Sequence, residues 1–302
     1  MSTIRPLALS SMWIQHRFDH LPPFLAAGRT LGFNSFELSH IVTPPMLDGL
    51  GDGEGIVSLH YPAPTVPHPA TGRAADALLS SPDEEARRWA VARGRMTMDT
   101  ARAVGARAVV VHLGEVQLDT SQEWALRQRY LAGQAGTLAY ERARARVWDE
   151  RERLKAPYLT AARRSLEELA EYAAQVGLRL GLETRFHAYQ IPSLEELIGL
   201  LAEFAGETVG YWHDTGHAQA LANLGFWPPT AWLEAAGARL IGVHLHDCRG
   251  WRDHLIPGLG EVDFAGLARR LSPDTLCVCE FDWYYEEDEI REGVQTLRRM
   301  GL

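Results

Sequence analysis

Residues 208–247 read TVGYWHDTGHAQALANLGFWPPTAWLEAAGARLIGVHLHD, and this stretch decides the fold. It holds two short apolar runs, 208–214 and 239–246, with helical patterning between them. Each run carries, at or near its end, a side chain able to bind a metal or move a proton: Asp214 in the first and His244 in the second. A strand, a helix and a further strand form the repeating unit of a parallel sheet.

The same unit recurs along the whole chain. Eight apolar runs are candidate strands: 6–10, 33–38, 55–60, 106–112, 178–183, 208–214, 239–246 and 276–281. The segments between them have apolar residues at helical spacing, and two of these segments start with Ser-x-x-Glu, the signature of a helix N-terminus, at Ser165 and Ser193. Eight such units predict a (β/α)8 TIM barrel. No Pro- or Gly-rich linker divides the chain, so we expect one domain over residues 1–302.

The interval between the fourth and fifth strands is longer than the others. Its extra residues, 118–157, are helical in composition and rich in arginine. We predict a helical insertion after strand 4, on the face where barrel enzymes build their active sites. Two interpretations stay open: a solvent-exposed helix with charge pairs such as Glu141 and Arg144, or a lid or anion-binding edge over the site.

Composition and charge exclude several classes of protein. The net charge of -9 argues against nucleic acid as the main partner. No run approaches the ~18 apolar residues of a membrane span. The first residues are too polar for a signal peptide. The three cysteines form no disulfide framework, so we expect a cytoplasmic protein.

Several cofactor chemistries are also disfavoured. Lys155 is the only lysine, which argues against Schiff-base catalysis. The sequence has neither a GxxxxGK[ST] loop nor a GxGxxG turn after a strand, so the usual nucleotide cradles are missing. We therefore expect no organic cofactor.

The strongest signal is the position of the polar residues. Residues able to bind a metal stand at the ends of seven candidate strands: Glu37, His60, His112, Glu183, Asp214, His244 and Glu280. The residues two positions earlier share the same face of each strand and are mostly small, which suits a barrel interior. By the same alternation Cys277 and Cys279 should point outward, and His213 should face the helices.

These strand ends should meet at one mouth of the barrel. Carboxylates buried together repel one another, and a divalent cation resolves that repulsion. Mixed oxygen and nitrogen ligands suit Mn²⁺, Zn²⁺, Co²⁺ or Fe²⁺. Two local motifs strengthen this prediction. Asp214 and His217 flank Gly216 at a turn, and a strand carrying His244 and His246 leads through a Pro/Gly loop to a helix capped by Asp263.

In the order and spacing of these motifs the chain resembles the xylose isomerase-like TIM barrels. This superfamily contains sugar and sugar-phosphate isomerases and epimerases, together with the endonuclease IV-type nucleases (AP endonuclease family 2). The resemblance covers nearly the whole chain and is weakest over 118–157. It implies a divalent metal held by Glu183, Asp214, His244 and Glu280.

The resemblance also implies an activity. We expect an isomerase or epimerase of a sugar, sugar phosphate or cyclitol, with Glu183 and Glu280 as catalytic residues that transfer a proton through a metal-stabilised enediolate. The expected partner is thus a small molecule, and a homodimer is the oligomer that related barrels favour. The residues expected to bind substrate are Glu37, His217, His246, Arg249 or Arg252, and Trp283.

The alternative is a multi-metal endonuclease IV-like hydrolase or phosphodiesterase. In that branch the additional metal ligands map onto His60, His112, His217 and His254. The nuclease pattern has Asp-x-His after the seventh strand, whereas this chain has Asp253 directly before His254, which weakens the case for a third metal. Lyase or dehydratase chemistry and a non-catalytic binding barrel are further alternatives.

Overall fold

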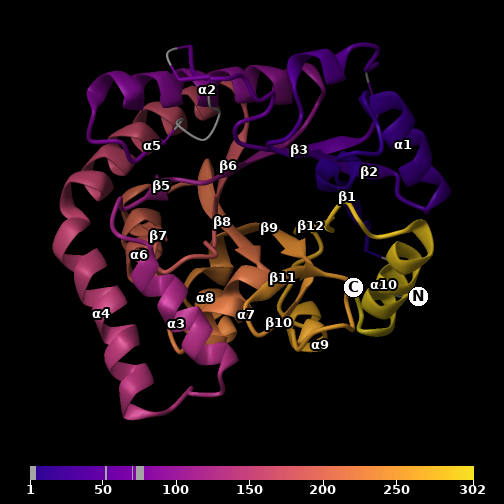
Figure 1. Cartoon of the computed structure of the whole chain (residues 1–302). Helices are drawn as coiled ribbons and strands as arrows, with labels where there is room; N and C mark the ends of the chain where they lie inside the picture. Colours follow the sequence, from indigo (N-terminus) through magenta and orange to yellow (C-terminus); the bar gives the residue numbers. More distant parts are fainter. Residues whose placement is uncertain (1–4, 52, 70, 73–77) are drawn as a thin grey trace.

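The computed structural model describes residues 5–51, 53–69, 71–72 and 78–302. Eight parallel strands close into a barrel in the order β1-β12-β9-β8-β6-β4-β3-β2 (Figure 1). Their bounds are β1 (Ala8–Ser10), β2 (Ser35–Leu38), β3 (Ile56–His60), β4 (Ala108–Val111), β6 (Arg179–Glu183), β8 (Val209–Asp214), β9 (Leu240–Leu245) and β12 (Leu276–Cys279). Each predicted apolar run contains one of these strands, so the TIM barrel fold is confirmed.

Helices surround the barrel, and two short antiparallel strand pairs extend from its loops. The helices are α1 (Leu21–Thr30), α2 (Glu84–Ala103), α3 (Ser121–Leu131), α4 (Leu138–Leu154), α5 (Ala156–Val176), α6 (Leu194–Glu203), α7 (Thr215–Asn223), α8 (Pro229–Ala236), α9 (Phe264–Ala268) and α10 (Glu287–Arg299). The strand pairs are β5 (Gly114–Glu115) with β7 (Gln190–Ile191), and β10 (Asp247–Arg249) with β11 (Arg252–Leu255). Within the described ranges, no helix is both long and apolar enough to cross a membrane.

One of the two predicted helix starts is confirmed and the other is wrong. Ser193 caps α6, where its Oγ accepts a hydrogen bond from the Glu196 amide, and the Glu196 carboxylate accepts one from the Ser193 amide. Ser165, by contrast, lies inside α5, which starts at Ala156. Its buried hydroxyl donates to the Leu79 carbonyl instead of capping a helix.

Trp212 fills the interior of the barrel beneath the mouth. Its side chain is fully buried in one apolar cluster with small and branched residues of other barrel strands, among them Ala108 of β4 and Val278 of β12. Gly181 and Gly242 make room for it, because a Cβ atom would lie 2.9 Å from the indole at Gly181 and 2.4 Å from it at Gly242. Small residues are therefore required on this face of the strands, because larger side chains would collide with the Trp212 ring.

The outward-facing residues also lie where alternation predicts. Cys277 and Cys279 are buried in the outer apolar core between strands and helices. His213 is buried on the same side, where its Nδ1 lies 2.6 Å from the Tyr211 hydroxyl. Its ring lines a cavity of about 250 Å³ under α7, α8 and α9.

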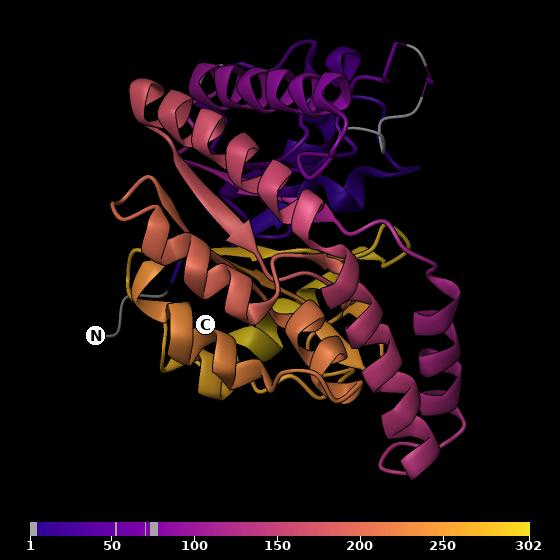
Figure 2. The ribbon, with the colours of Figure 1, turned by 90° about the vertical axis from the view of Figure 1, so that its left-hand side faces the viewer.

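The predicted insertion after strand 4 is helical and forms the pair α3 and α4. The two helices lie side by side at one edge of the molecule (Figure 2). Arg144 and Glu141 form a surface ion pair, as one interpretation expected.

Two other arginines of the insertion are buried, unlike the residues of a solvent-exposed helix. Arg127 and Arg151 are fully buried, and they pair with Glu123 and with Glu196 of α6, respectively. Breaking a buried ion pair leaves an uncompensated charge. The Arg151 pair fixes α4 to α6 of the barrel, whereas Arg127 and Glu123 pair within α3. Glu123 in turn accepts a hydrogen bond from the Ala188 amide in the loop after β6. These contacts argue against a lid that swings.

Candidate metal centre at the barrel mouth

Four of the predicted ligands meet at the carboxyl ends of the barrel strands. Glu183 ends β6, Asp214 ends β8, His244 lies in β9, and Glu280 directly follows β12. One ligand atom from each of these side chains lies within 4.8 Å of all the others, and all four residues are buried. The strand register explains part of this convergence. Asp214 of β8 is paired with His244 of β9, and His244 is paired with Val278 of β12, two residues before Glu280.

The imidazole of His244 is the geometric centre of this group. Its Nδ1 lies 2.8 Å from Glu183 Oε1, 3.2 Å from Glu280 Oε2 and 3.4 Å from Asp214 Oδ2. Its Nε2 lies 2.9 Å from Glu37 Oε1. Nδ1 is therefore the nitrogen that faces the other ligands, and Nε2 can donate its proton to Glu37.

The position of Glu37 does not fit the substrate-binding role expected for it. The side chain is completely buried, and its second oxygen accepts a hydrogen bond of 2.6 Å from the Ser58 hydroxyl. Both oxygens are thus occupied below the mouth. A carboxylate that accepts the second N–H of a ligating histidine fixes the ring and raises its basicity. Glu37 is placed to orient His244.

The electrostatics of the four residues fit a divalent cation. Burial alone raises the pKa of Glu183, but His112 and His244 hold that pKa well below its ordinary value. Burial opposes ionisation of Asp214 as well, and His217 and His246 hold its pKa well below the usual range. The pKa of His244 is raised well above normal despite burial, because Glu280, Glu37 and Glu183 surround it. Carboxylates kept ionised in a buried site need positive charge. The neighbouring imidazoles supply it when protonated, and a divalent cation that displaced those protons would supply it in their place.

A second donor group adjoins the first through Glu183. His60, at the end of β3, and His112, directly after β4, each offer a ligand atom within 4.8 Å of one on Glu183. Glu183 Oε2 lies 3.2 Å from His60 Nε2 and also contacts His112 Nε2, while Oε1 faces His244. One carboxylate therefore joins two possible metal positions.

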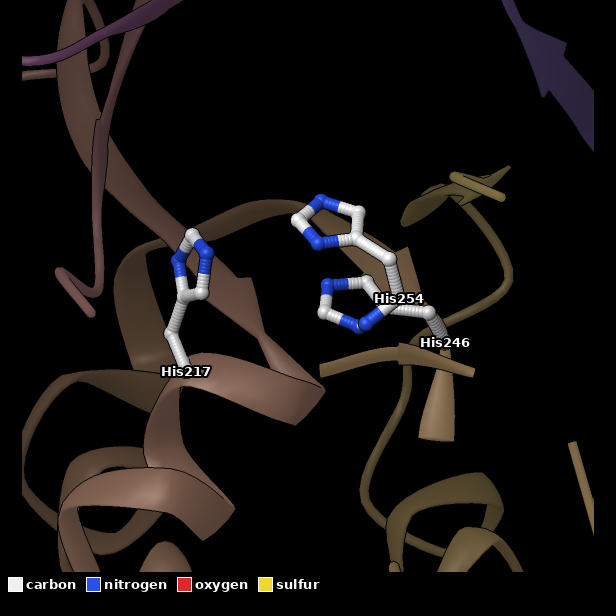
Figure 3. A group of neighbouring side chains, drawn as sticks. All are labelled: His217, His246 and His254. Carbon is white, nitrogen blue, oxygen red and sulfur yellow. The ribbon is translucent and has the colours of Figure 1, made fainter. Parts of the chain in front are cut away.

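A third group consists of three imidazoles, from His217, His246 and His254 (Figure 3). His217 lies in the first turn of α7, His246 follows β9, and His254 is in β11. The rings of His246 and His254 stack with centroids 4.3 Å apart. His246 Nε2 is also 2.9 Å from Asp214 Oδ2, so this group adjoins the first one as well.

Asp253 reaches this third group although it directly precedes His254. Asp253 Oδ2 lies 3.2 Å from His254 Nδ1 and 3.5 Å from His217 Nε2. Neighbouring residues of an extended strand point to opposite faces. His254, however, has a φ of 52°, in the left-handed region. That backbone turn brings both side chains to the mouth, so the one-residue displacement does not exclude Asp253 from the group.

Asp247 holds the loop that carries Asp253 and His254. Its buried carboxylate accepts four backbone hydrogen bonds of 2.8–3.0 Å, from the amides of residues 248, 258, 260 and 262. Gly260 has to be glycine here, because a Cβ atom would lie 2.3 Å from Asp247 Oδ1. The Pro/Gly loop recognised in the sequence is thus organised around one carboxylate.

The remaining predicted substrate residues lie away from the four-ligand group. Arg249 is exposed in β10. Arg252 is exposed in β11 and donates a hydrogen bond of 3.2 Å to the Tyr284 hydroxyl. Trp283 is 40% exposed, and its ring packs against His16. Their part in substrate binding stays a prediction.

Two residues at the mouth were missed by the sequence reasoning. The buried Arg185, two residues after Glu183, has its Nη1 3.3 Å from Glu183 Oε2. His40, two residues after β2, has its ring centroid 5.4 Å from that of His60. Their position in the sequence could have indicated them. Each lies two residues after the end of a barrel strand, which places it at the mouth of the barrel.

Comparison with known proteins supports this architecture. The structure of a D-tagatose 3-epimerase-like protein has a TM-score of 0.68 and 17% identity, covering 98% of this chain and 96% of that one. D-psicose 3-epimerase from Clostridium cellulolyticum H10, solved with D-tagatose, has a TM-score of 0.68 and 16% identity, covering 98% and 99%. The IolI protein with a bound zinc atom has a TM-score of 0.64 and 15% identity, covering 98% and 96%. At these identities the likeness establishes the fold.

Sequence comparison gives one short match and one long one. The uncharacterized protein y4fM of Sinorhizobium fredii is 26% identical over 110 residues, which make up 36% of this chain and about a third (34%) of that protein. The model of the family described as "Xylose isomerase-like TIM barrel" matches residues 25–300. This match spans nearly the whole chain, including every strand whose end contributes to the candidate metal centre. The protein therefore belongs to the xylose isomerase-like TIM barrel family.

Proposed function

We propose that this protein is a divalent-metal-dependent enzyme that isomerises or epimerises a sugar, a sugar phosphate or a cyclitol. The observation that carries the proposal is the convergence of Glu183, Asp214, His244 and Glu280 within 4.8 Å of one another. This donor set suits Mn²⁺, Zn²⁺, Co²⁺ or Fe²⁺. Proteins of similar structure include D-psicose 3-epimerase and a zinc-bound protein, which supports the same substrate class and cofactor.

Glu183 and Glu280 are the groups that would exchange a proton with the substrate. In the barrel, β6 and β12 are separated by β8 and β9, so Glu183 and Glu280 approach the centre from different directions. When bound, a divalent cation polarises a carbonyl and its adjacent hydroxyl and makes the neighbouring C–H more acidic. One glutamate then removes that proton and the other returns a proton from the opposite side, which inverts the carbon; return to the adjacent carbon isomerises the sugar.

Proton exchange with solvent tests this proposal directly. The Mn²⁺- or Co²⁺-loaded protein is incubated in D₂O with D-tagatose, D-psicose, D-fructose and a panel of ketocyclitols, and the carbon-bound protons are followed by NMR. We expect deuterium to enter one substrate at the carbon beside its carbonyl. Glu183→Gln and Glu280→Gln should each stop the exchange, whereas His20→Ala, at an exposed histidine before α1, should leave it unchanged. No exchange with any of these compounds would contradict the proposal.

A second candidate function is multi-metal hydrolysis of a phosphodiester. Two observations favour it: Glu183 joins two donor groups, and Asp253 reaches His217 and His254. Adjacent metals stabilise the attacking and the leaving oxygens of such a reaction. The acidic net charge of -9 favours a small phosphodiester over DNA.

Metal stoichiometry and a chromogenic substrate separate the two functions. Hydrolysis predicts two or three metal ions per chain, loss of metal in His112→Ala and His254→Ala, and release of p-nitrophenol from bis(p-nitrophenyl) phosphate. Isomerisation predicts that one ion suffices and that both variants retain it.

A further inference from the structure

His40 stands at the mouth of the barrel and has no part in the three donor groups. It lies two residues beyond β2, and its ring meets that of His60 at an angle of 61°, with centroids 5.4 Å apart. His60 belongs to the donor group that includes the candidate catalytic Glu183. Through its contact with His60, His40 thus adjoins the proposed chemistry.

His40 is exposed, and it lies beside the buried His60. Burial among neighbouring atoms and the nearby His60 lower its pKa to about 4, while Glu280 and Glu183 act to raise it. The ring is therefore within electrostatic reach of both candidate catalytic carboxylates. Yet the residue is exposed to solvent, unlike Glu183, Asp214 and His244. His40 is therefore an accessible side chain next to a buried donor group, where a bound small molecule can contact it.

The backbone around His40 is held in place from several sides. The Ser39 amide donates to the buried Ser11 hydroxyl at 2.7 Å, and the Val42 amide donates to the Ser39 carbonyl at 3.1 Å. The His40 carbonyl itself accepts a hydrogen bond from the Thr65 hydroxyl. Among the described residues, none forms a hydrogen bond with the imidazole of His40. The segment is therefore preorganised, while its ring nitrogens stay available to a ligand.

We propose that His40 is a substrate-contacting residue whose imidazole forms a hydrogen bond with a hydroxyl or carbonyl oxygen of the sugar. This inference rests on the proposed function, and it names the side of the mouth where the sugar lies: between the end of β2 and the candidate catalytic glutamates. It also replaces Glu37 as the substrate contact from β2, since Glu37 is buried beneath His244.

Binding of simple ketoses to the metal-loaded protein tests the assignment. The probes are D-tagatose, D-psicose and D-fructose, titrated calorimetrically into the Co²⁺-loaded wild type and the variants His40→Ala and His40→Gln. His20→Ala is the matched control, because His20 is an exposed histidine before α1. Cobalt content and the cobalt absorption spectrum are measured for every variant.

We expect His40→Ala to weaken binding of the best ketose about tenfold, the effect of losing one hydrogen bond in a desolvated site. His40→Gln should recover part of the affinity, and His20→Ala should bind as the wild type does. Cobalt content and spectrum should be the same in all four proteins, which separates a substrate contact from a structural part of the metal centre.

Two results would overturn the assignment alone: unchanged ketose binding in His40→Ala, or loss of cobalt from that variant. If the fully loaded wild type binds none of the three ketoses, nor any ketose phosphate or ketocyclitol titrated in the same way, the proposed function fails, and the role of His40 that rests on it fails as well.

Discussion

Glu37 Oε1 lies 2.9 Å from Nε2 of His244, on the opposite edge of the ring from Glu183, Asp214 and Glu280. This contact holds Nε2 of His244 against Glu37, so Nδ1 is the nitrogen that faces the other candidate ligands. Glu37, a candidate substrate-binding residue from the sequence, is thus in contact with a candidate metal ligand instead.

Glu37→Gln should weaken metal binding by about tenfold to a hundredfold, as loss of a carboxylate partner behind a histidine ligand does in other metal sites. The measurement is the dissociation constant for Zn²⁺ or Co²⁺ from a competition titration with a chelator. Ser58→Ala is the matched control. It removes only the hydrogen bond to the second oxygen of Glu37, so its effect should be smaller. Equal metal affinity in wild type and Glu37→Gln would refute the role of Glu37.

Gly242→Ala should destabilise the barrel by about 1–3 kcal/mol, because the added methyl group would lie 2.4 Å from the Trp212 ring and force the core apart. Chemical denaturation measures the change in the free energy of unfolding. Gly199→Ala serves as the control: it lies within α6 with no atom near its Cβ position, and it should stabilise the protein by about 0.5–1 kcal/mol. Similar stabilities for the two variants would show that Trp212 does not fill the barrel as tightly as described.

His213 should make the protein acid-sensitive. Burial lowers its pKa in the folded state to about 4, against about 6.5 in the unfolded chain. Between these pH values the unfolded chain binds a proton that the folded protein does not. The stability contribution is therefore complete above about pH 6.5 and is lost as the pH falls toward 4.

The magnitude of that loss is about 3 kcal/mol for a shift of this size. His213→Phe removes the titrating group, and its ring can extend into the adjoining cavity of about 250 Å³. Denaturation curves of the metal-free protein at pH 7 and pH 5 should differ less for this variant than for the wild type. If both proteins lose the same stability on acidification, His213 does not titrate in this range.

Asp247→Asn should loosen the loop that carries Asp253 and His254, because an amide oxygen cannot replace a carboxylate that accepts four backbone hydrogen bonds. We expect faster hydrogen exchange at residues 248–262, measured by mass spectrometry. Asp263→Asn is the control: it weakens only the cap of α9, where Asp263 accepts from the Gly266 amide, and should leave the loop protected. Unchanged exchange in Asp247→Asn would contradict this account of the loop.

Much of the fold and of the candidate site was predictable from the sequence, because side chains along a short strand alternate between the barrel interior and the surrounding helices. Glu183, Asp214, His244 and Glu280 stand at or near strand ends, and closing a parallel barrel brings those ends together. Trp212 illustrates the same rule inside the barrel, where neighbouring glycines accommodate it.

The residues that sequence reasoning misplaced depend on backbone geometry or depth, which alternation does not specify. Asp253 joins the third group only because His254 adopts a φ of 52°. Glu37 faces the barrel interior as the candidate ligands do, but it is buried deeper in the barrel, beneath His244. Arg127 and Arg151 are buried because carboxylates from Glu123 and Glu196 meet them, and a charged helical stretch gives no sign of such pairing.

The most direct test of the account is the metal content of the protein, measured by elemental mass spectrometry after purification without chelator or a His-tag. At least one divalent ion per chain should be present in the wild type, or taken up from Mn²⁺, Zn²⁺ or Co²⁺. Asp214→Asn and His244→Ala should lose it while keeping the wild-type circular dichroism spectrum. A wild-type protein that holds no ion after incubation with all three metals would contradict the central claim that these strand ends form a metal centre.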